Sequence, residues 1–313
     1  MVRAFVFPGQ GSQEVGMGLA LSEAFPAARL VFEEVDDALE VRLSKIMFEG
    51  PLEELTLTQN AQPALMAVSM AVIRVLEEEG GKKVSEMAAF VAGHSLGEYS
   101  ALAAAGALPL AETARLLQTR GEAMQAAVPV GRGAMAAILG PSLEDVESIA
   151  ADAAEDQVCD VANDNSDGQV VVSGDTEAVE RAVEIAKERG ARKAMMLTVS
   201  APFHCSLLDP AADVMTYALA TASMSAPNPP VVANVTAAPV SDPDDIRNLL
   251  IEQVTSRVRW RECVLTMRDQ GVDELCEIGA GKVLTGLVRR IDREISGRAI
   301  GNPADIEDFL ATL

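Results

Sequence analysis

Short apolar runs alternate with helical stripes along the chain. Apolar residues at every third or fourth position predict a helix over about 63–78. Two β-rich runs, 3–7 and 87–92, each stop at a glycine-containing turn, and the second is apolar at nearly every position, as in a strand buried on both faces. Because such strands alternate with helical segments, we predict an α/β fold with a parallel sheet covered by helices.

The same patterning predicts the remaining elements outside the middle of the chain. We expect helices at about 17–24, 27–39, 96–105, 111–128, 207–221, 243–255, 260–270, 283–291 and 303–313, and strands at about 231–234 and 274–278.

The segment 129–199 has an order of its own. Strands are expected at about 134–139, 158–162, 170–173 and 193–199, and helices at about 143–153 and 176–189. The two middle strands flank a turn rich in Asn, Asp and Gly, and Ser142 is placed to cap the first helix. This β-α-β-β-α-β order is the ferredoxin-like arrangement. We therefore predict a small ferredoxin-like insert over 129–199 in a discontinuous large α/β domain made of 1–128 and 200–313.

Composition narrows the class of protein. The chain has 313 residues, 49% of them hydrophobic, and a formal charge of −22. Such an acidic chain is a poor ligand for nucleic acid or for an anionic membrane surface, so neither partner is expected. The longest apolar stretch, 64–76, is interrupted by Arg74 and is shorter than the roughly 20 residues of a spanning helix. The N-terminal apolar run is broken by Pro8, so we expect no signal peptide and a cytoplasmic location.

Cysteine and histidine usage argues against a metal centre. Only four cysteines and two histidines are present, and no two cysteines form a C-x-x-C pair. A common zinc site therefore lacks its ligands, and reduced thiols in the core are expected.

Residues 93–97, Gly-His-Ser-Leu-Gly, fit the G-x-S-x-G nucleophile elbow between a predicted strand and a predicted helix. The turn presents the Ser95 hydroxyl at a helix N-terminus, where the backbone N–H of Leu96 is placed to bind an oxyanion. A serine needs a base to take its proton. His94 adjoins Ser95 and diverges from it at a tight turn, which leaves His204. No acid is selected by the sequence to orient this histidine, and Asp209 is only a weak candidate.

Arg120 lies on the apolar face of the predicted helix 111–128, four residues after Leu116. A buried guanidinium needs an acceptor, and two interpretations stay open on residue chemistry alone: an internal salt bridge, or a clamp for a substrate carboxylate. The loop 8–13, Pro-Gly-Gln-Gly-Ser-Gln, likewise reads either as a plain turn or as an anion-binding nest; it lacks the residues of a Walker A loop.

Five motifs in order carry a resemblance to a known family. The motifs are Phe7 to Gln13, Gly93 to Glu98, Gln118 to Gly121, Gly168 to Gly174 and Pro202 to His204. On these motifs the chain resembles the malonyl-CoA:acyl-carrier-protein transacylases of fatty-acid synthesis and the related acyltransferase domains of polyketide synthases, from Phe5 to about Gly286. The resemblance implies a large hydrolase-like α/β domain with a ferredoxin-like insert. It also suggests a free-standing enzyme.

The resemblance assigns the reactive residues. It makes Ser95 the nucleophile that forms a malonyl ester and His204 the base. It makes Arg120 the partner of the free malonyl carboxylate, which favours the clamp. A backbone carbonyl, that of Gln253, would orient the histidine in place of an acid.

The resemblance also assigns the surrounding site. The backbone N–H groups of Gln10 and Leu96 would form the oxyanion hole, and Phe203 suggests a malonyl-type pocket. We place Met124 and Asn163 among the substrate-binding residues as well. One departure is that the loop 163–168 contains two aspartates, more acidic than the family suggests.

The implied reaction is a ping-pong transfer of malonyl from malonyl-CoA to the phosphopantetheine thiol of acyl carrier protein, in a fatty-acid or a polyketide pathway. It requires no metal or bound cofactor, because CoA is part of the substrate, and a monomer is expected. Two rivals stay open: a serine esterase or thioesterase, and a non-catalytic carrier-binding subunit.

The negative charge is unevenly distributed. Residues 253–298 contain nine Lys and Arg against seven Asp and Glu. Acidic carrier proteins and CoA phosphates would be repelled by a uniformly acidic enzyme. We therefore consider the basic residues of 253–298, with those at 187, 189, 192 and 193, as a candidate docking patch; the alternative is scattered solvated charge.

Overall fold

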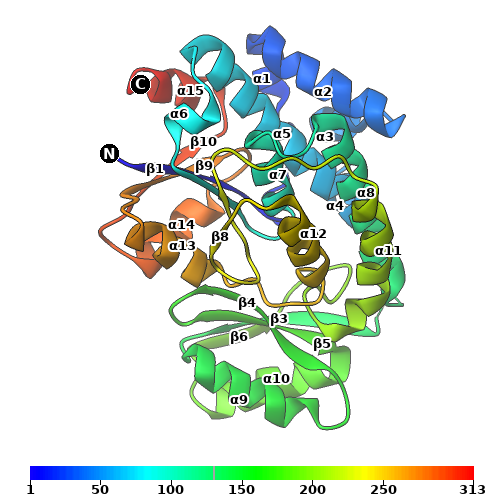
Figure 1. Ribbon diagram of the computed structural model, residues 1–313. Helices are drawn as coiled ribbons and strands as arrows, with labels where there is room; N and C mark the ends of the chain where they lie inside the picture. The colour runs from blue at the N-terminus through cyan, green and yellow to red at the C-terminus, as the bar shows by residue number, and fades with distance from the viewer. Residues whose placement is uncertain (130) are drawn as a thin grey trace.

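The computed structural model describes residues 1–129 and 131–313, so Val130, which falls in the predicted insert, lies outside the described residues. The chain forms a six-stranded sheet and a separate four-stranded sheet. In Figure 1 the larger sheet and most helices fill the upper part of the molecule, and the smaller sheet lies at the lower end with two helices beneath it.

The large sheet has the order β10-β9-β1-β2-β7-β8. All neighbouring strands are parallel except β7 and β8, which form a short antiparallel pair. The strands are β1 (Arg3–Phe7), β2 (Phe90–Gly93), β7 (Val231–Val232), β8 (Pro239–Val240), β9 (Glu274–Ile278) and β10 (Ser296–Ile300).

Helices cover both faces of this sheet because alternate strand residues point to opposite sides. Phe5 and Phe7 pack in the larger core with helices such as α2, α5 and α8, whereas Ala4 and Val6 pack in the smaller core with α13 and α14. The helices are α1 (Leu19–Ala24), α2 (Pro26–Leu39), α3 (Leu43–Glu49), α4 (Leu52–Thr56), α5 (Thr58–Gly80), α6 (Val84–Met87), α7 (Gly97–Ala104), α8 (Leu110–Ala127), the 3-10 turn η1 (Ser206–Leu208), α11 (Asp209–Ala220), α12 (Pro243–Glu252), α13 (Trp260–Asp269), α14 (Val283–Ile291) and α15 (Pro303–Leu310).

The small sheet is antiparallel, in the order β4-β5-β3-β6, and its elements follow the predicted β-α-β-β-α-β order. They are β3 (Gly133–Leu139), α9 (Leu143–Ala154), β4 (Cys159–Ser166), β5 (Gln169–Asp175), α10 (Thr176–Glu188) and β6 (Lys193–Met196). Ser142 caps α9 by accepting from the backbone N–H of Asp145. The predicted fold class is confirmed, while the boundaries at 128/129 and 199/200 stay a prediction.

Two segments differ from their predicted structure in kind. The strand expected over 87–92 begins only at Phe90, because Val84–Met87 form a helical turn in which Glu86 accepts a hydrogen bond from the Lys83 N–H at 2.8 Å. The polar turn expected from Asn163 to Gly168 is mostly strand. β4 runs on to Ser166, which pairs with Gln169 of β5, and the polar side chains of Asp164 and Asn165 are bonded to Arg261 and His94 of the large domain.

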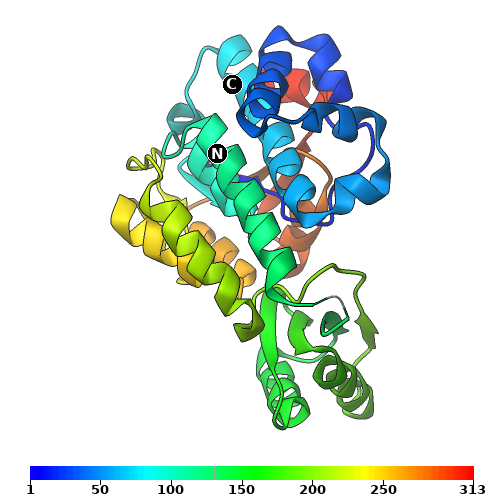
Figure 2. The same ribbon diagram turned by 90° about the vertical axis from the view of Figure 1, so that its right-hand side faces the viewer.

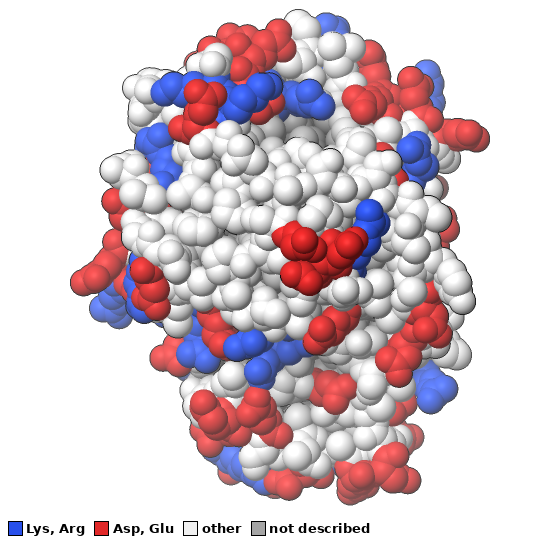
Figure 3. All heavy atoms as spheres, viewed as in Figure 1, with Lys and Arg blue, Asp and Glu red and all other residues white. Residues whose placement is uncertain are grey.

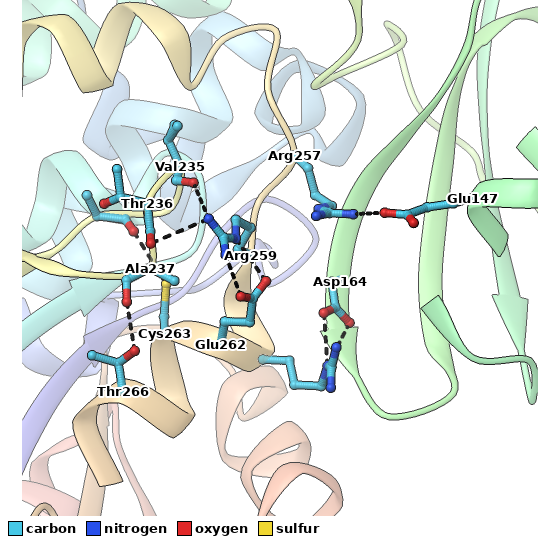
Figure 4. A network of polar contacts seen from close by, with 12 residues as sticks. Glu147, Asp164, Val235, Thr236, Ala237, Arg257, Arg259, Glu262, Cys263 and Thr266 are labelled. Atoms are coloured by element: carbon cyan, nitrogen blue, oxygen red, sulfur yellow. Dashed lines mark hydrogen bonds and ion pairs between the residues drawn. The ribbon is translucent and has the colours of Figure 1, made fainter. Parts of the chain in front are cut away.

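The two domains are joined beside β4. Val258 makes an isolated bridge with Asn163: its N–H donates to Ala162 O at 2.8 Å and its carbonyl accepts from the Asp164 N–H at 3.0 Å. The Arg261 guanidinium binds the buried Asp164 carboxylate at 2.9 Å, and the Arg257 guanidinium binds Glu147 at 2.6 Å across the same gap (Figure 4). The junction is therefore a short strand pairing flanked by ion pairs.

The surface mixes charges of both signs. Figure 3, which has the same view as Figure 1, shows acidic and basic groups interspersed over this face of the molecule, around a broad area without charged side chains. No helix within residues 1–129 and 131–313 is long and apolar enough to cross a membrane.

Candidate active site

The site lies where parallel strands of the large sheet end. The loops after β1, β2 and β7 contain Gln10, Ser95 and Asn234, and these three strands are adjacent in the sheet. The carboxyl ends of neighbouring parallel strands form a crevice, which is the usual location of ligands in an open α/β sheet. In Figure 2 helix α8 runs down toward the insert, and the chain passes from this helix into the small domain.

The turn after β2 is tight enough to require glycine. A Cβ on Gly93 would lie 1.9 Å from the carbonyl carbon and oxygen of Gly97, which no side chain can occupy. Ser95 has φ 54, a strained value for a residue other than glycine. Its N–H donates to Asn234 Oδ1 at 2.8 Å, so a neighbouring loop holds the strained turn.

Ser95, His204 and the Gln253 carbonyl form a hydrogen-bonded chain. The Ser95 hydroxyl lies 2.8 Å from His204 Nε2, and His204 Nδ1 donates to Gln253 O at 2.9 Å. The carbonyl can only accept, so the neutral imidazole has its proton on Nδ1 and its Nε2 is free to accept the serine proton. Burial and the charge of Arg120 lower the pKa of His204 to about 3. The imidazole is therefore in the basic form at neutral pH.

The other candidates for these roles make different contacts. His94 Nε2 donates to Asn165 Oδ1 at 2.8 Å, and its ring lies against Trp260, so it supports the junction with the insert. Burial lowers the pKa of His94. Asp209 is exposed at the start of α11, and the Nδ1 that it would orient is already bonded to Gln253 O. The weak suggestion of Asp209 as a triad acid is therefore wrong.

Arg120 is fully buried beside the nucleophile. Its guanidinium donates to Gln62 Oε1 at 2.9 Å, to Gln253 Oε1 at 2.9 Å and to Ser95 Oγ at 3.0 Å. Within residues 1–129 and 131–313 no carboxylate lies within ion-pair distance, and its Nε has no partner. Burial lowers the pKa of Arg120. The internal salt bridge considered from the sequence is thus not formed.

A pocket of about 490 Å³ opens in front of these groups, a size typical of ligand sites. Gln10, Leu96, Phe203 and Asn163 line it, as do Ser95, Arg120 and His204. Within the described chain, the backbone N–H groups of Gln10 and Leu96 donate to no protein acceptor, as an oxyanion hole requires. Met124 is not among the lining residues; its sulfur lies 3.7 Å from Gln62 Nε2, behind Arg120.

Three residues of the site were not singled out from the sequence. Gln62 accepts from Arg120, Asn234 accepts from the Ser95 N–H, and Glu98 accepts from Asn234 and Gln253. Glu98 directly follows the elbow motif and ends the family motif Gly93 to Glu98, so its position was visible, but single amides such as Gln62 and Asn234 have no local signature.

The basic residues of the candidate docking patch fall into two groups, those that form ion pairs and those that do not. Arg257, Arg259, Arg261, Arg268 and Arg298 form ion pairs with carboxylates, and Lys187 and Arg189 do so in the insert. In the described parts of the chain, the patch members without an ion pair are Arg192, Lys193, Lys282, Arg289, Arg290 and Arg293.

No group of three or more His, Cys, Asp and Glu side chains within 1–129 and 131–313 is arranged to hold a metal ion.

Known proteins share this sequence and architecture. A family model described as "Acyl transferase domain" matches residues 4–300. The chain is 46% identical over 311 residues to "Malonyl CoA-acyl carrier protein transacylase" of Bacillus subtilis (strain 168), covering 99% of this chain and 96% of the relative.

Two solved structures are also similar. The acyl-carrier-protein-S-malonyltransferase of Bartonella henselae is 57% identical with a TM-score of 0.97, over 100% of this chain and 99% of the other. The second is a chain of the structure titled "type II PKS acyl-carrier protein in complex with its malonyl-transacylase". It is 43% identical with a TM-score of 0.96, over 100% of this chain and 100% of the other.

Proposed function

The chain belongs to the acyl transferase family, and on this premise we propose that it transfers malonyl from malonyl-CoA to the phosphopantetheine thiol of an acyl carrier protein. The observation that carries the proposal is the buried Arg120, whose guanidinium reaches Ser95 and has no carboxylate within ion-pair distance in the described residues. A malonyl group attached to this serine would bring its free carboxylate to the guanidinium, a bidentate partner. The relatives described above bear the name of this activity.

In the first half-reaction Ser95 Oγ attacks the thioester carbonyl while its proton passes to His204 Nε2. The oxyanion of the tetrahedral intermediate accepts from the N–H groups of Gln10 and Leu96. Collapse breaks the C–S bond, and the departing CoA sulfur takes the proton from His204. The product is free CoA and a malonyl ester on Ser95.

The second half-reaction runs the same steps with a different thiol. His204 takes the proton of the phosphopantetheine thiol, whose sulfur attacks the ester carbonyl. Collapse returns the electron pair to Ser95 Oγ, which recovers the proton from His204. All acid–base groups come from the chain, CoA and carrier enter as substrates, and no further cofactor takes part.

Phe203 and Asn163 lie on the wall of the same pocket and are proposed to contact the acyl group and its thioester arm. Met124 is proposed to act from behind, through Gln62.

For the carrier, we propose docking at the pocket mouth through Arg192, Lys193, Lys282 and Arg290, called here the mouth patch. Lys282 precedes Val283, which lines the pocket, and Arg290 donates to Gln169, which lines it from the insert. Lys193 pairs with Leu139, the strand neighbour of Gln169. Three exposed cations are thus linked to residues of the entry that an acidic carrier would approach, and the exposed Arg192 directly precedes one of them.

The chain is further proposed to act in the cytoplasm as a monomer, because one chain supplies every group of the pocket and its four cysteines are buried thiols. Nucleic acid and membranes are not proposed partners, given the net charge of −22.

Trapping the acyl-enzyme tests the proposal directly. After mixing with malonyl-CoA, intact-protein mass spectrometry should show one malonyl adduct, which Ser95→Ala abolishes. Ser100→Ala is the matched control, since Ser100 is a buried serine on the following helix whose hydroxyl has no partner in the described chain. This control should keep the adduct. Absence of an adduct on the wild type would support a non-catalytic carrier-binding role.

Adding carrier protein separates transfer from hydrolysis. If the adduct moves to the carrier thiol, the transferase is supported. If water removes it faster than saturating carrier does, the enzyme is an esterase, a reading that gives no role to a buried arginine beside the serine.

A further inference from the structure

Glu98 is a buried carboxylate that the proposed reaction does not use. It lies three residues after Ser95, in the first turn of α7, and is 1% exposed. Its Oε2 accepts from the backbone N–H of Asn234 at 3.0 Å and from Gln253 Nε2 at 2.8 Å. No basic group within 1–129 and 131–313 forms an ion pair with it. Two donors from distant segments therefore converge on one oxygen atom.

Both donors belong to residues that hold the reactive groups. Asn234 accepts from the Ser95 N–H with its side-chain oxygen and donates from Nδ2 to Gly93 O at 2.7 Å. Gln253 holds His204 with its backbone carbonyl, while its Nε2 also donates to Ser95 O at 3.1 Å. Glu98 thus contacts the supports of the nucleophile and of the base.

The side chain of Gln253 links this carboxylate to Arg120. Gln253 Oε1 accepts from the guanidinium at 2.9 Å, and Nε2 faces Glu98. The orientation of the amide follows from its neighbours: a guanidinium only donates, so it must face oxygen, and the Ser95 carbonyl only accepts, so it must face nitrogen. A flipped amide would point its hydrogens at Arg120 and lose every one of these bonds.

We propose that Glu98 is a positioning residue for acyl selectivity: it fixes the side-chain amide of Gln253 and thereby the direction of the Arg120 guanidinium. The inference rests on the proposed malonyl transfer, in which Arg120 binds the carboxylate. It assigns two separable roles to Gln253, the backbone carbonyl for His204 and the side chain for Arg120.

The burial of Glu98 is consistent with an acceptor role. Burial raises the pKa of Glu98 to about 7, and the hydrogen bonds from Asn234 and Gln253, with the charge of Arg120, oppose this rise. The network uses one oxygen atom, Oε2, that accepts two hydrogen bonds, and the side-chain oxygen of a glutamine at position 98 can also accept two.

The test measures the ratio of kcat/KM for malonyl-CoA to that for acetyl-CoA in the full-length protein, together with the melting temperature. Glu98→Ala should lower this ratio by about tenfold or more, because a guanidinium that is no longer aimed loses the carboxylate-specific contact that acetyl never makes. Arg120→Ala sets the maximal loss. Glu98→Gln should restore the ratio to within about threefold of the wild type, since its oxygen accepts in the same place.

Two further variants keep the result interpretable. Gln253→Met retains the backbone carbonyl but removes the amide, so it should lower the ratio as Glu98→Ala does, and the double variant should show no additional loss. It also serves if Glu98→Ala does not fold. Glu274→Ala is the matched control: Glu274 is a buried glutamate at the start of β9, paired with Arg3 away from the site, so its loss should lower the melting temperature but not the ratio.

A folded Glu98→Ala or Gln253→Met protein that keeps the wild-type ratio would overturn the inference. So would a Glu98→Gln protein whose ratio falls as far as that of Glu98→Ala. Failure of the proposed function is distinguishable, because the wild type would then form no malonyl adduct or would lose its adduct to water rather than to the carrier thiol.

Discussion

At the scale of single residues, the Arg120 guanidinium is enclosed by neutral acceptors. Two glutamine oxygens and the Ser95 hydroxyl take its hydrogen bonds, and no carboxylate of the described chain neutralises it at ion-pair distance. A buried charge is costly unless it is paired. A substrate carboxylate therefore gains more here than at an exposed arginine, and an acyl group without one leaves the charge unpaired.

The pH dependence of acylation follows from the environment of His204. Because burial and Arg120 lower its pKa to about 3, from 6.5, the imidazole stays neutral in the folded protein. We expect the rate constant of malonyl-serine formation to show no loss from His204 protonation between about pH 8 and pH 5. Rapid-quench measurements across this range check the expectation.

The lowered pKa of His204 also makes the free energy of unfolding depend on pH, although it leaves acylation unaffected in this range. The unfolded chain protonates this histidine below pH 6.5, whereas the folded chain does not, so its contribution to stability is present above pH 6.5 and lost as pH falls toward about 3.

The acylation profile would contradict a neutral His204 if it had an inflection near pH 6.5 that persists in Glu98→Gln, the variant that lacks the carboxyl with a pKa of about 7.

Residue chemistry predicted the reactive groups better than their supports. Ser95 was visible from the elbow motif, His204 because only two histidines exist, and Arg120 from its place on an apolar helix face. Asn234 and Gln62 were not, because a lone amide acquires its role only when distant segments meet. The Gln253 carbonyl was available only from the family resemblance, since every residue has a carbonyl.

At the scale of elements, the approach of α5 and α8 sets the position of Arg120. Gly121 allows this approach, because a Cβ there would lie 2.5 Å from the Gln59 Cα. Gly121→Ala should force the helices apart, cost about 1–3 kcal/mol of unfolding free energy and weaken the bond between Arg120 and Gln62. Denaturant titration and the malonyl-to-acetyl adduct ratio measure the two effects.

Gly286→Ala is the control for that substitution, because a Cβ at Gly286 in α14 meets nothing within 4 Å. It should leave stability equal or slightly higher, as alanine favours helix. Equal free energies of unfolding for Gly121→Ala and the wild type would show that the close contact at Gly121 does not determine how α5 and α8 pack.

Elements with long, regular periodicity were predicted within a few residues. The helix expected at 111–128 is Leu110–Ala127, and the strand at 274–278 matches Glu274–Ile278. Short polar elements were missed: β10, Ser296–Ile300, has an exposed or half-buried side chain at four of five positions and lacks an apolar pattern. Its pairing with β9, rather than its composition, makes it a strand.

At the scale of the whole molecule, some basic side chains form ion pairs within the chain, whereas others are exposed without one. The arginines nearest Gln253 hold the two domains together or pair locally, and the mouth patch is made of four of the six patch members that form no ion pair in the described chain. Net charge alone therefore does not describe what a carrier protein meets at the entry.

Charge reversal tests the mouth patch. The double variant Lys282→Glu with Arg290→Glu should raise KM for the carrier roughly tenfold at low salt, an effect that added salt diminishes. Arg74→Glu makes a similar change on an exposed residue of α5, twelve positions along the helix from the pocket residue Gln62, and should leave KM unaltered. Equal KM values for both variants would place the docking surface elsewhere.

The order of strands in the large sheet has a consequence for synthesis on the ribosome. β1 lies inside the sheet beside β9, whose first residue, Glu274, is translated 271 residues after Arg3 of β1. The four strands of the insert pair with one another within a short length of chain, so this unit has its partners early. The nascent chain thus contains Ser95 long before His204 and the Gln253 carbonyl exist. Reactivity toward thioesters therefore cannot precede the translation of Gln253.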